Sequence, residues 1–221
     1  MSKLITAKEA LSRVKSGMSV MLGGFFSTGS PVGLIRELMN CGISDLTIIS
    51  NDAASEFQNP GAIGNELIRS GMVSKMICTF SGHNVAAQER SAAGLLAIEI
   101  VPMGTFAERI RAGGAGLGGI LTPTGVGTVV EQGKQIMWLH GKPYLLEEAL
   151  RADVALLYAG AADEDGNTWL RGNLKNFAIA MSTAADYVVM EAREVLRSGQ
   201  MDPDTVSIPA PLVDAVVKGG E

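Results

Sequence analysis

The sequence is poor in charge, in cysteine and in aromatic side chains. Asp, Glu, Lys and Arg make up 19% of the 221 residues, below the roughly 25% that is typical of globular chains. Neither Lys nor Arg forms a run, and the formal net charge is −5, so bulk affinity for nucleic acid or for a membrane surface is not expected. A surface with so few charges indicates that part of it is covered by a partner chain.

Only two cysteines are present, Cys41 and Cys78, and they do not form a C-x-x-C pair. The usual zinc and redox motifs are therefore not expected, and a reducing, cytoplasmic setting is favoured. His83 and His140 are isolated from other metal-ligating residues, so we expect no metal site. Charged side chains interrupt residues 1–14, which argues against a signal peptide, and no apolar run approaches the ~20 residues of a membrane-spanning helix.

What the sequence does have is hydrophobic residues, 47%, and 27 glycines, arranged as short apolar runs that alternate with amphipathic segments. The runs predict strands at residues 19–22, 46–50, 75–80, 97–101, 153–158 and 187–190. The other segments predict helices at residues 65–69, 85–93 and 176–184, and a hairpin at residues 135–146. Strands separated by helices of this length predict βαβ units. We therefore expect an α/β fold, one domain over residues 1–221, with an open, mixed but mostly parallel sheet flanked by helices.

Three helix starts carry capping signatures. These are Thr6 with Glu9, Ser30 with Pro31, and Thr105 with Glu108. In the first and third pairs a hydroxyl and a carboxylate would each satisfy one free amide of the first turn, and in the second Ser30 would be the N-cap. The helix that starts at Thr6 is expected to end near Gly17.

The first candidate site is the segment from Gly23 to Pro31, between a predicted strand and a predicted helix start. Glycine at positions 23 and 24 lets the backbone approach a ligand closely. Amides near the positive end of a helix attract anions, and open α/β sheets bind ligands at the carboxyl ends of strands. The same residues also fit a tight turn before a proline-initiated helix, because neither a Walker nor a dinucleotide spacing is present. Both interpretations stay open at this point.

The second candidate site is the glycine-rich run from Gly113 to Gly119. Gly114, Gly116 and Gly119 satisfy G-x-G-x-x-G, but the run follows a predicted helix instead of a strand, which argues against dinucleotide binding. Five glycines in seven residues predict a loop whose backbone passes close to a ligand or to another chain. The Gly/Thr/Pro stretch Thr122–Thr128 extends this predicted loop.

Together these segments resemble the A subunit of the family I CoA-transferases, the group of acetate, butyrate–acetoacetate and 3-oxoacid CoA-transferases. The resemblance covers nearly the whole chain, and its order and spacing make it specific. The segments that carry it are Gly23-Gly24-Phe25 with Gly29 and Pro31, Leu46–Asp52, Gly104-Thr105 with Glu108, Arg109–Gly116, Thr122–Gly125 and Asp165–Asn167.

The resemblance implies a reaction through a glutamate that forms first a mixed anhydride and then a glutamyl-CoA thioester. In the family this glutamate belongs to the B subunit, and no Glu-Asn-Gly-like segment is found here. The resemblance therefore implies no catalytic residue in this chain, a partner B subunit in an assembly of two A and two B chains, and CoA as a substrate instead of a permanent cofactor. The acids exchanged would be short ones, such as acetate, butyrate or acetoacetate.

The resemblance also assigns two groups of site residues. The residues expected to bind CoA are Gly23, Gly24, Phe25, Phe26, Ser27, Thr28 and Gly29. The residues expected to form a substrate and oxyanion loop are Met103, Gly104, Gly113, Gly114 and Gly116. Met103 stands where many relatives have a Gln whose amide is thought to help bind the oxyanion, and methionine cannot donate a hydrogen bond. Met103 could instead line a more apolar acyl pocket.

Two other functions fit an α/β sheet of this kind. A sugar-phosphate isomerase would need an acid/base pair in this chain, and no Lys–carboxylate or His–carboxylate constellation stands out in the sequence. A small-molecule sensor would need no catalytic residue, but no DNA-binding appendage is visible at either end. The CoA-transferase A subunit is the leading hypothesis.

Overall fold

The computed structural model describes residues 2–55, 59 and 61–220. In the first half of the chain the elements are α1 (Ala7–Leu11), β1 (Ser19–Leu22), α2 (Val32–Met39), β2 (Leu46–Ser50), α3 (Ile63–Arg69), β3 (Val73–Cys78), α4 (Val85–Ala92), β4 (Ala97–Ile100) and α5 (Met103–Gly114). In the second half they are β5 (Gly119–Thr122), β6 (Ile136–Leu139), β7 (Lys142–Glu148), β8 (Ala152–Asp163), β9 (Thr168–Trp169), α6 (Ala178–Ala184), β10 (Ala185–Leu196) and β11 (Ala215–Lys218).

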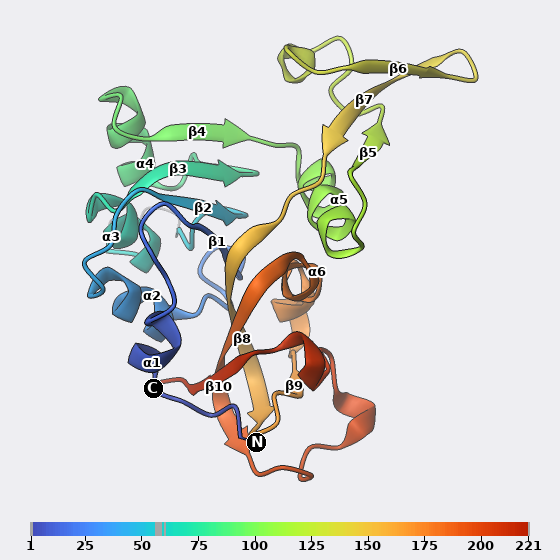
Figure 1. Ribbon diagram of the computed structural model, residues 1–221. Helices are drawn as coiled ribbons and strands as arrows, with labels where there is room; N and C mark the ends of the chain where they lie inside the picture. The colour runs from blue at the N-terminus through green and yellow to red at the C-terminus, as the bar shows by residue number, and fades with distance from the viewer. Residues whose placement is uncertain (1, 56–58, 60, 221) are drawn as a thin grey trace.

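The main sheet has eight strands among the residues described, in the order β11-β10-β8-β1-β2-β3-β4, with β9 paired to β8. Its pairings are parallel apart from the antiparallel β8–β9 pair, so the predicted α/β class with a mostly parallel sheet is confirmed. A smaller antiparallel sheet has the order β5-β7-β6 and projects from the rest of the chain (Figure 1).

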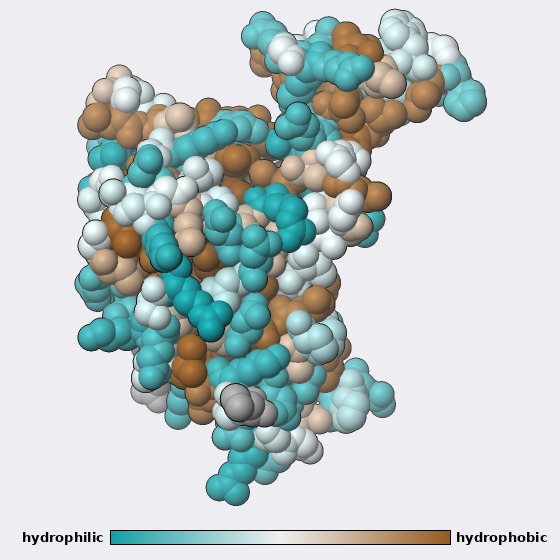
Figure 2. All heavy atoms as spheres, viewed as in Figure 1, coloured by the Kyte–Doolittle hydropathy of each residue, from teal (hydrophilic) through white to brown (hydrophobic). Residues whose placement is uncertain are grey.

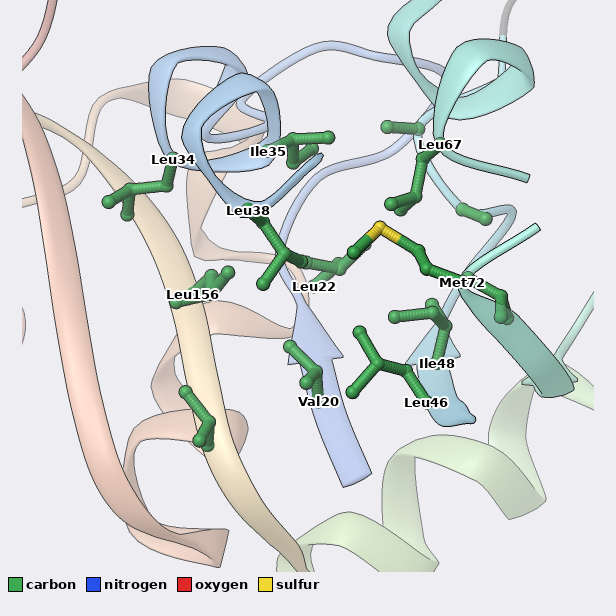
Figure 3. Close-up of a cluster of buried hydrophobic side chains, with 14 of the residues drawn as sticks. Val20, Leu22, Leu34, Ile35, Leu38, Leu46, Ile48, Leu67, Met72 and Leu156 are labelled. Carbon is green, nitrogen blue, oxygen red and sulfur yellow. The ribbon is translucent and has the colours of Figure 1, made fainter. Parts of the chain in front are cut away.

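Two hydrophobic cores lie on the two faces of the main sheet. Val20 and Leu22 of β1 pack in the core beneath α2 and α3, whereas Met21 between them packs in the core that holds Phe106 of α5. Figure 3 shows the first core, and Figure 1 shows α1–α4 on one side of the sheet with α5 and α6 on the other. Successive side chains of a strand point to opposite faces, so a strand covered on both sides must be apolar throughout. This explains why residues 19–22 and 46–50 were predicted with their correct bounds.

The long strands β8 and β10 extend beyond their predicted bounds, and β11 was missed. β8 and β10 pair from Ala185 with Ala152 to Leu196 with Asp163, whereas the sequence predicted only residues 153–158 and 187–190. The later part of β8 is made of Ala and Gly, and that of β10 contains charged residues, both of which are depleted in strands. Pairing between the two strands overrides this weak local preference. The strand predicted at residues 97–101 is β4, an edge strand whose Ile100 is 52% exposed, although its apolar sequence is typical of a buried strand.

The first helix start was predicted correctly and the other two were not. Thr6 caps α1, since its hydroxyl accepts from the Glu9 amide at 3.2 Å and the Glu9 carboxylate accepts from the Thr6 amide at 2.9 Å. This helix ends at Leu11, well before Gly17. The predicted caps Ser30 and Thr105 are wrong, because Pro31 and Pro102 occupy the N-cap positions of α2 and α5 and neither N-cap residue makes a side-chain hydrogen bond to its helix.

The glycine loop predicted from Gly113 begins later, at Ala115, because Gly113 and Gly114 are the last residues of α5. A Cβ on Gly113 would collide with the carbonyl oxygen of Leu150, and a Cβ on Gly114 would collide with Thr183 of α6. Gly116 has a φ of 72°, and the Leu117 amide donates to the Ala112 carbonyl at 2.9 Å, which is a Schellman helix end. These glycines let α5 pack tightly and then stop.

The small sheet carries exposed apolar side chains on its outer strand. The predicted hairpin is confirmed, with β6 and β7 joined at His140 and Gly141, whose φ values are 50° and 74°. Trp138 is 69% exposed and Leu139 is 42% exposed. Figure 2 shows apolar atoms on this projection beside polar ones. Arg109 of α5 anchors the sheet through its Nε bond of 2.7 Å to the Glu148 carbonyl.

We expect Gly113→Ala to lower the free energy of unfolding by about 1–3 kcal/mol, because its methyl group meets the backbone of Leu150. Gly118→Ala is the matched control, since a Cβ there meets nothing within 4 Å. Urea unfolding followed by circular dichroism measures both variants. Equal stability of the two would contradict the packing role of Gly113.

Candidate functional site

The candidate site lies at the carboxyl edge of the main sheet. The loops that follow β1, β2 and β3 leave this edge side by side because the three strands are parallel neighbours, and α5 begins just after the end of β4. With neighbouring strands about 4.8 Å apart, the ends of β1 and β4 are separated by roughly 15 Å. The chain extends from β1 toward β4 and then returns to place β8 on the other side of β1. The β1–β8 crevice is therefore a topological switch point, the usual ligand position in such sheets.

A buried carboxylate joins the loops after β1 and β2. Asp52 is 0% exposed, and its Oδ2 accepts from the Phe26 amide at 2.8 Å and from the Asn51 side-chain amide at 3.0 Å. The Ser27 hydroxyl donates to the Ala54 carbonyl at 2.8 Å. Burial raises the pKa of Asp52 above its usual range, although its hydrogen bonds act in the opposite direction.

These two loops hold four residues in left-handed backbone conformations. The φ angles are 47° at Phe26, 63° at Ser27, 54° at Ala53 and 55° at Ala54. A side chain in this region costs of order 1–3 kcal/mol, and such residues cluster at functional sites. The sequence alone does not reveal them, since none of the four is a residue type that favours this conformation.

The loop after β3 adds aromatic rings to the same edge. The amides of Thr79 and Phe80 donate to the Asn51 carbonyl at 3.0 and 3.2 Å. The His83 ring lies 5.1 Å from the Phe26 ring and 4.8 Å from the Phe80 ring, measured between centroids. Phe26 and Phe80 are 36% and 42% exposed, so the edge presents an aromatic surface. The sequence analysis did not predict Phe80 as a site residue, and only its position after a buried strand could have indicated it.

Most amides in the first candidate loop are already bonded within the chain. Phe25 and Thr28 exchange two backbone hydrogen bonds of 3.0 Å, and the Ser30 amide donates to the Ser27 carbonyl at 3.2 Å. The start of α2 is also occupied, because Glu191 of β10 accepts from the Gly33 amide at 3.2 Å and from the Leu34 amide at 2.8 Å. Of the two interpretations left open for this segment, these bonds favour the tight turn before the helix at the positions they occupy.

A cavity of about 410 Å³ lies at the switch point, next to this loop. Its lining includes Ser27, Gly29 and Arg36 from the first half of the chain and Tyr158 and Glu191 from β8 and β10. Glu191 is 3% exposed, and burial raises its pKa above the usual range. The cavity thus combines polar groups from both sides of the switch point.

The structure divides the second predicted group of site residues. Met103 and Gly104 begin α5 at the carboxyl edge, near the first group Gly23–Gly29. Gly113, Gly114 and Gly116 lie at the other end of this helix, and at 1.5 Å per residue Gly104 and Gly114 are about 15 Å apart. Gly113 contacts Leu150, just before β8, which is the amino edge of the sheet. A single substrate and oxyanion loop made of all five residues is therefore wrong.

The described residues contain no group of three or more His, Cys, Asp or Glu side chains placed to hold a metal ion. None of the helices in the same residues has the length and hydropathy to cross a membrane.

Comparison with known proteins gives consistent likenesses over the whole chain. A family profile described as coenzyme A transferase matches residues 4–219. The acetate CoA-transferase subunit alpha of Escherichia coli (strain K12) is 42% identical over 220 residues, which cover 100% of this chain and 98% of that protein. The acetoacetyl-CoA:acetate/butyrate CoA transferase alpha subunit of Clostridium acetobutylicum is 42% identical over 217 residues, 98% of each chain.

A solved structure shares the fold. An acyl-CoA transferase from Escherichia coli O157:H7, determined as a thioester complex with CoA, is similar with a TM-score of 0.85 and 21% identity. The likeness covers 98% of this chain and 47% of that one.

The stability of the chain should depend on pH through Glu191. Burial raises the pKa of this carboxyl, so the folded state binds its proton more tightly than the unfolded chain does, and its contribution to stability is lost as the pH rises through the folded pKa. We expect the stability of the wild type relative to Glu191→Gln to increase as the pH falls from neutral toward the usual carboxyl value of 4.5. Urea unfolding at several pH values measures this, with the exposed Glu194→Gln as control. A difference between wild type and Glu191→Gln that is constant with pH would contradict the assignment.

Proposed function

The chain belongs to the coenzyme A transferase family, and on that premise we propose that it is the A subunit of a heteromeric enzyme that moves CoA between short-chain carboxylic or 3-oxo acids. The observation that most supports this proposal is the 42% identity, over essentially full length, to two chains named as alpha subunits of such enzymes. Neither alternative, the sugar-phosphate isomerase or the sensor, gains support from any of these likenesses.

The nucleophile of the proposed reaction is a glutamate of the partner B subunit. That glutamate attacks the thioester carbonyl of the acyl-CoA, the CoA thiolate leaves, and a mixed anhydride forms. The thiolate then attacks the glutamyl carbonyl of the anhydride, which releases the first acid as its carboxylate and leaves a glutamyl-CoA thioester. The second acid repeats the two steps in reverse order and leaves as its CoA thioester.

The carboxylates that this chain places near the carboxyl edge fit such a division of labour. Asp52 is fully buried and bonded to the Phe26 amide and the Asn51 side chain. Glu191 is bonded to two amides of α2. Both carboxylates accept hydrogen bonds from backbone amides, which fits a role in positioning the loop after β1 and the start of α2.

In this proposal CoA is a substrate that binds over the loop Gly23–Gly29, with Phe26 and Phe80 offering apolar contact to it. Met103 and Gly104 lie farther along the same edge, where the acyl end of the substrate would be. Gly113 and Gly114 have a packing role instead, and Gly116 ends α5 with its left-handed backbone.

The proposed assembly contains two A and two B chains, each A chain forming one domain over residues 1–221. Exposed apolar residues such as Trp138 are consistent with a surface covered by another chain. The proposed location is the cytoplasm, since both cysteines are free thiols and Cys41 is exposed.

The purified chain alone should show no CoA-transferase activity, and co-expression with its cognate partner should restore it. The physical reason is that the proposed nucleophile belongs to the other chain. The measurement is the transfer of CoA from acetoacetyl-CoA to acetate, with and without the partner. Robust turnover by the isolated chain would refute the proposal.

Phe26→Ala in the complex should raise KM for acyl-CoA about three- to tenfold, the loss of roughly 1 kcal/mol of aromatic contact. Leu95→Ala is the matched control, because Leu95 is 60% exposed in the turn between α4 and β4, at the opposite edge of the sheet. Steady-state kinetics with a fixed concentration of free acid measure both variants. Unchanged KM for acyl-CoA in Phe26→Ala would remove this ring from the CoA site.

A further inference from the structure

The first turn of α5 has backbone donors that the described chain does not cap. α5 is twelve residues long, its N-cap is Pro102, and no side chain or acidic residue satisfies its first turn. The amides of Met103, Gly104 and Thr105 have no partner within the helix, because an α-helix leaves its first amides unpaired. The partial positive charge of the helix dipole adds to these donors, so the turn attracts an anion.

A buried hydroxyl provides a second and independent observation at the same place. Thr105 is 3% exposed, yet its Oγ1 has no hydrogen-bond partner in the described part of the chain. A buried hydroxyl without a partner destabilises a fold, so such a group in a native protein needs a reason. A bound ligand that accepts its proton would supply one.

Thr105 lines a cavity of about 540 Å³ between α5 and β5. Gly104 and Ala107 of α5 and Ile120, Leu121 and Thr122 of β5 share this lining. A Cβ built on Gly104 meets nothing within 4 Å, so the space in front of the first turn is open. The walls contributed by Ala107, Ile120 and Leu121 are apolar. The cavity therefore offers donors at one end and hydrocarbon along its side.

The charges near the cavity favour a singly charged anion over a phosphate. No Lys or Arg is among the residues that line it, and phosphate sites usually have such a cation. Glu108 is the one charged residue in the lining, and Arg111 pairs with it at 3.1 Å, which reduces its repulsion of an anion. A carboxylate can be held by amides and a hydroxyl alone.

We propose that this cavity binds the free carboxylic acid of the reaction, with its carboxylate on the first turn of α5 and the Thr105 hydroxyl. The short alkyl or 3-oxo chain of the acid lies against Ala107, Ile120 and Leu121. This inference rests on the proposed transferase function and assigns the acid to a site within the A chain. It makes Thr105 a substrate-binding residue and leaves the reacting glutamate on the partner.

The test uses the complete complex of both subunits and varies acetate or butyrate against a fixed acyl-CoA. Thr105→Val removes the donor while keeping the shape, and it should raise KM for the free acid about tenfold, the equivalent of roughly 1.4 kcal/mol. KM for acyl-CoA should stay within about twofold. Thr105→Ser keeps the hydroxyl and should restore KM for the acid, which a merely structural role of the side chain would not require.

Gly104→Ala is a second variant, which keeps the test decisive if Thr105→Val does not fold. Gly104 lines the cavity and a methyl group there has room within the protein, so the complex should fold while KM rises more for butyrate than for acetate. Thermal unfolding of each complex checks that the fold is kept.

The possible outcomes separate the two proposals. A wild-type complex without any transferase activity overturns the proposed function itself. An active wild type in which Thr105→Val and Gly104→Ala leave KM for the acid unchanged overturns only the acid site. A rise in KM for acyl-CoA, with that for the acid unchanged, would place a phosphate of CoA in the cavity and would also overturn it.

Discussion

The hydrogen bond from the Phe26 amide to the Asp52 carboxylate holds together the edge of the sheet on which the candidate site is built. Phe26 and Ser27 have left-handed backbones, and so do Ala53 and Ala54 in the neighbouring loop. Each conformation costs of order 1–3 kcal/mol, while a hydrogen bond to a charged group contributes about 1.5–3 kcal/mol. The hydrogen bonds between the two loops therefore offset part of the cost of these conformations. Because Asn51 also accepts from Thr79, the loops after β1, β2 and β3 behave as one unit.

Sequence patterns predicted the fold best where burial on both faces demands apolar residues. β1 and β2 have such sequences and were predicted with their correct bounds. The full lengths of β8 and β10 were not predicted. Their later halves contain alanine, glycine and charged residues, which are held in strands by the pairing of the two strands. Local patterns fail where long-range pairing decides. The helix starts at Ser30 and Thr105 failed for another reason, since a following or preceding proline took the cap position.

The candidate site was predictable in part from the order of the motifs, which carried the family resemblance, and the family match confirms that resemblance. The positions of the site residues relative to one another could not be predicted from these motifs. Gly113 and Gly114 were predicted to lie in a ligand-binding loop, because a run of glycines lets another group come close to the backbone. In the structure the groups close to them are Leu150 and Thr183 of the same chain. Asp52 was missed because its role depends on burial and on its bond to Phe26, 26 residues away in the sequence. The role proposed for Thr105 depends on its burial, and neither feature is visible in composition or spacing.

Two glycines of helix α5, Gly104 and Gly113, have opposite surroundings. Gly113 is fixed by its neighbours, because any side chain there meets the backbone before β8, whereas Gly104 stands before open space. A substitution at position 104 is therefore compatible with folding, and alanine there even suits a helix better. Descendants of such a chain can alter the contents of the cavity one residue at a time while the scaffold stays intact. The fold thus separates a position that packing fixes from one that can change, and this separation would let the proposed acid cavity acquire new acid preferences.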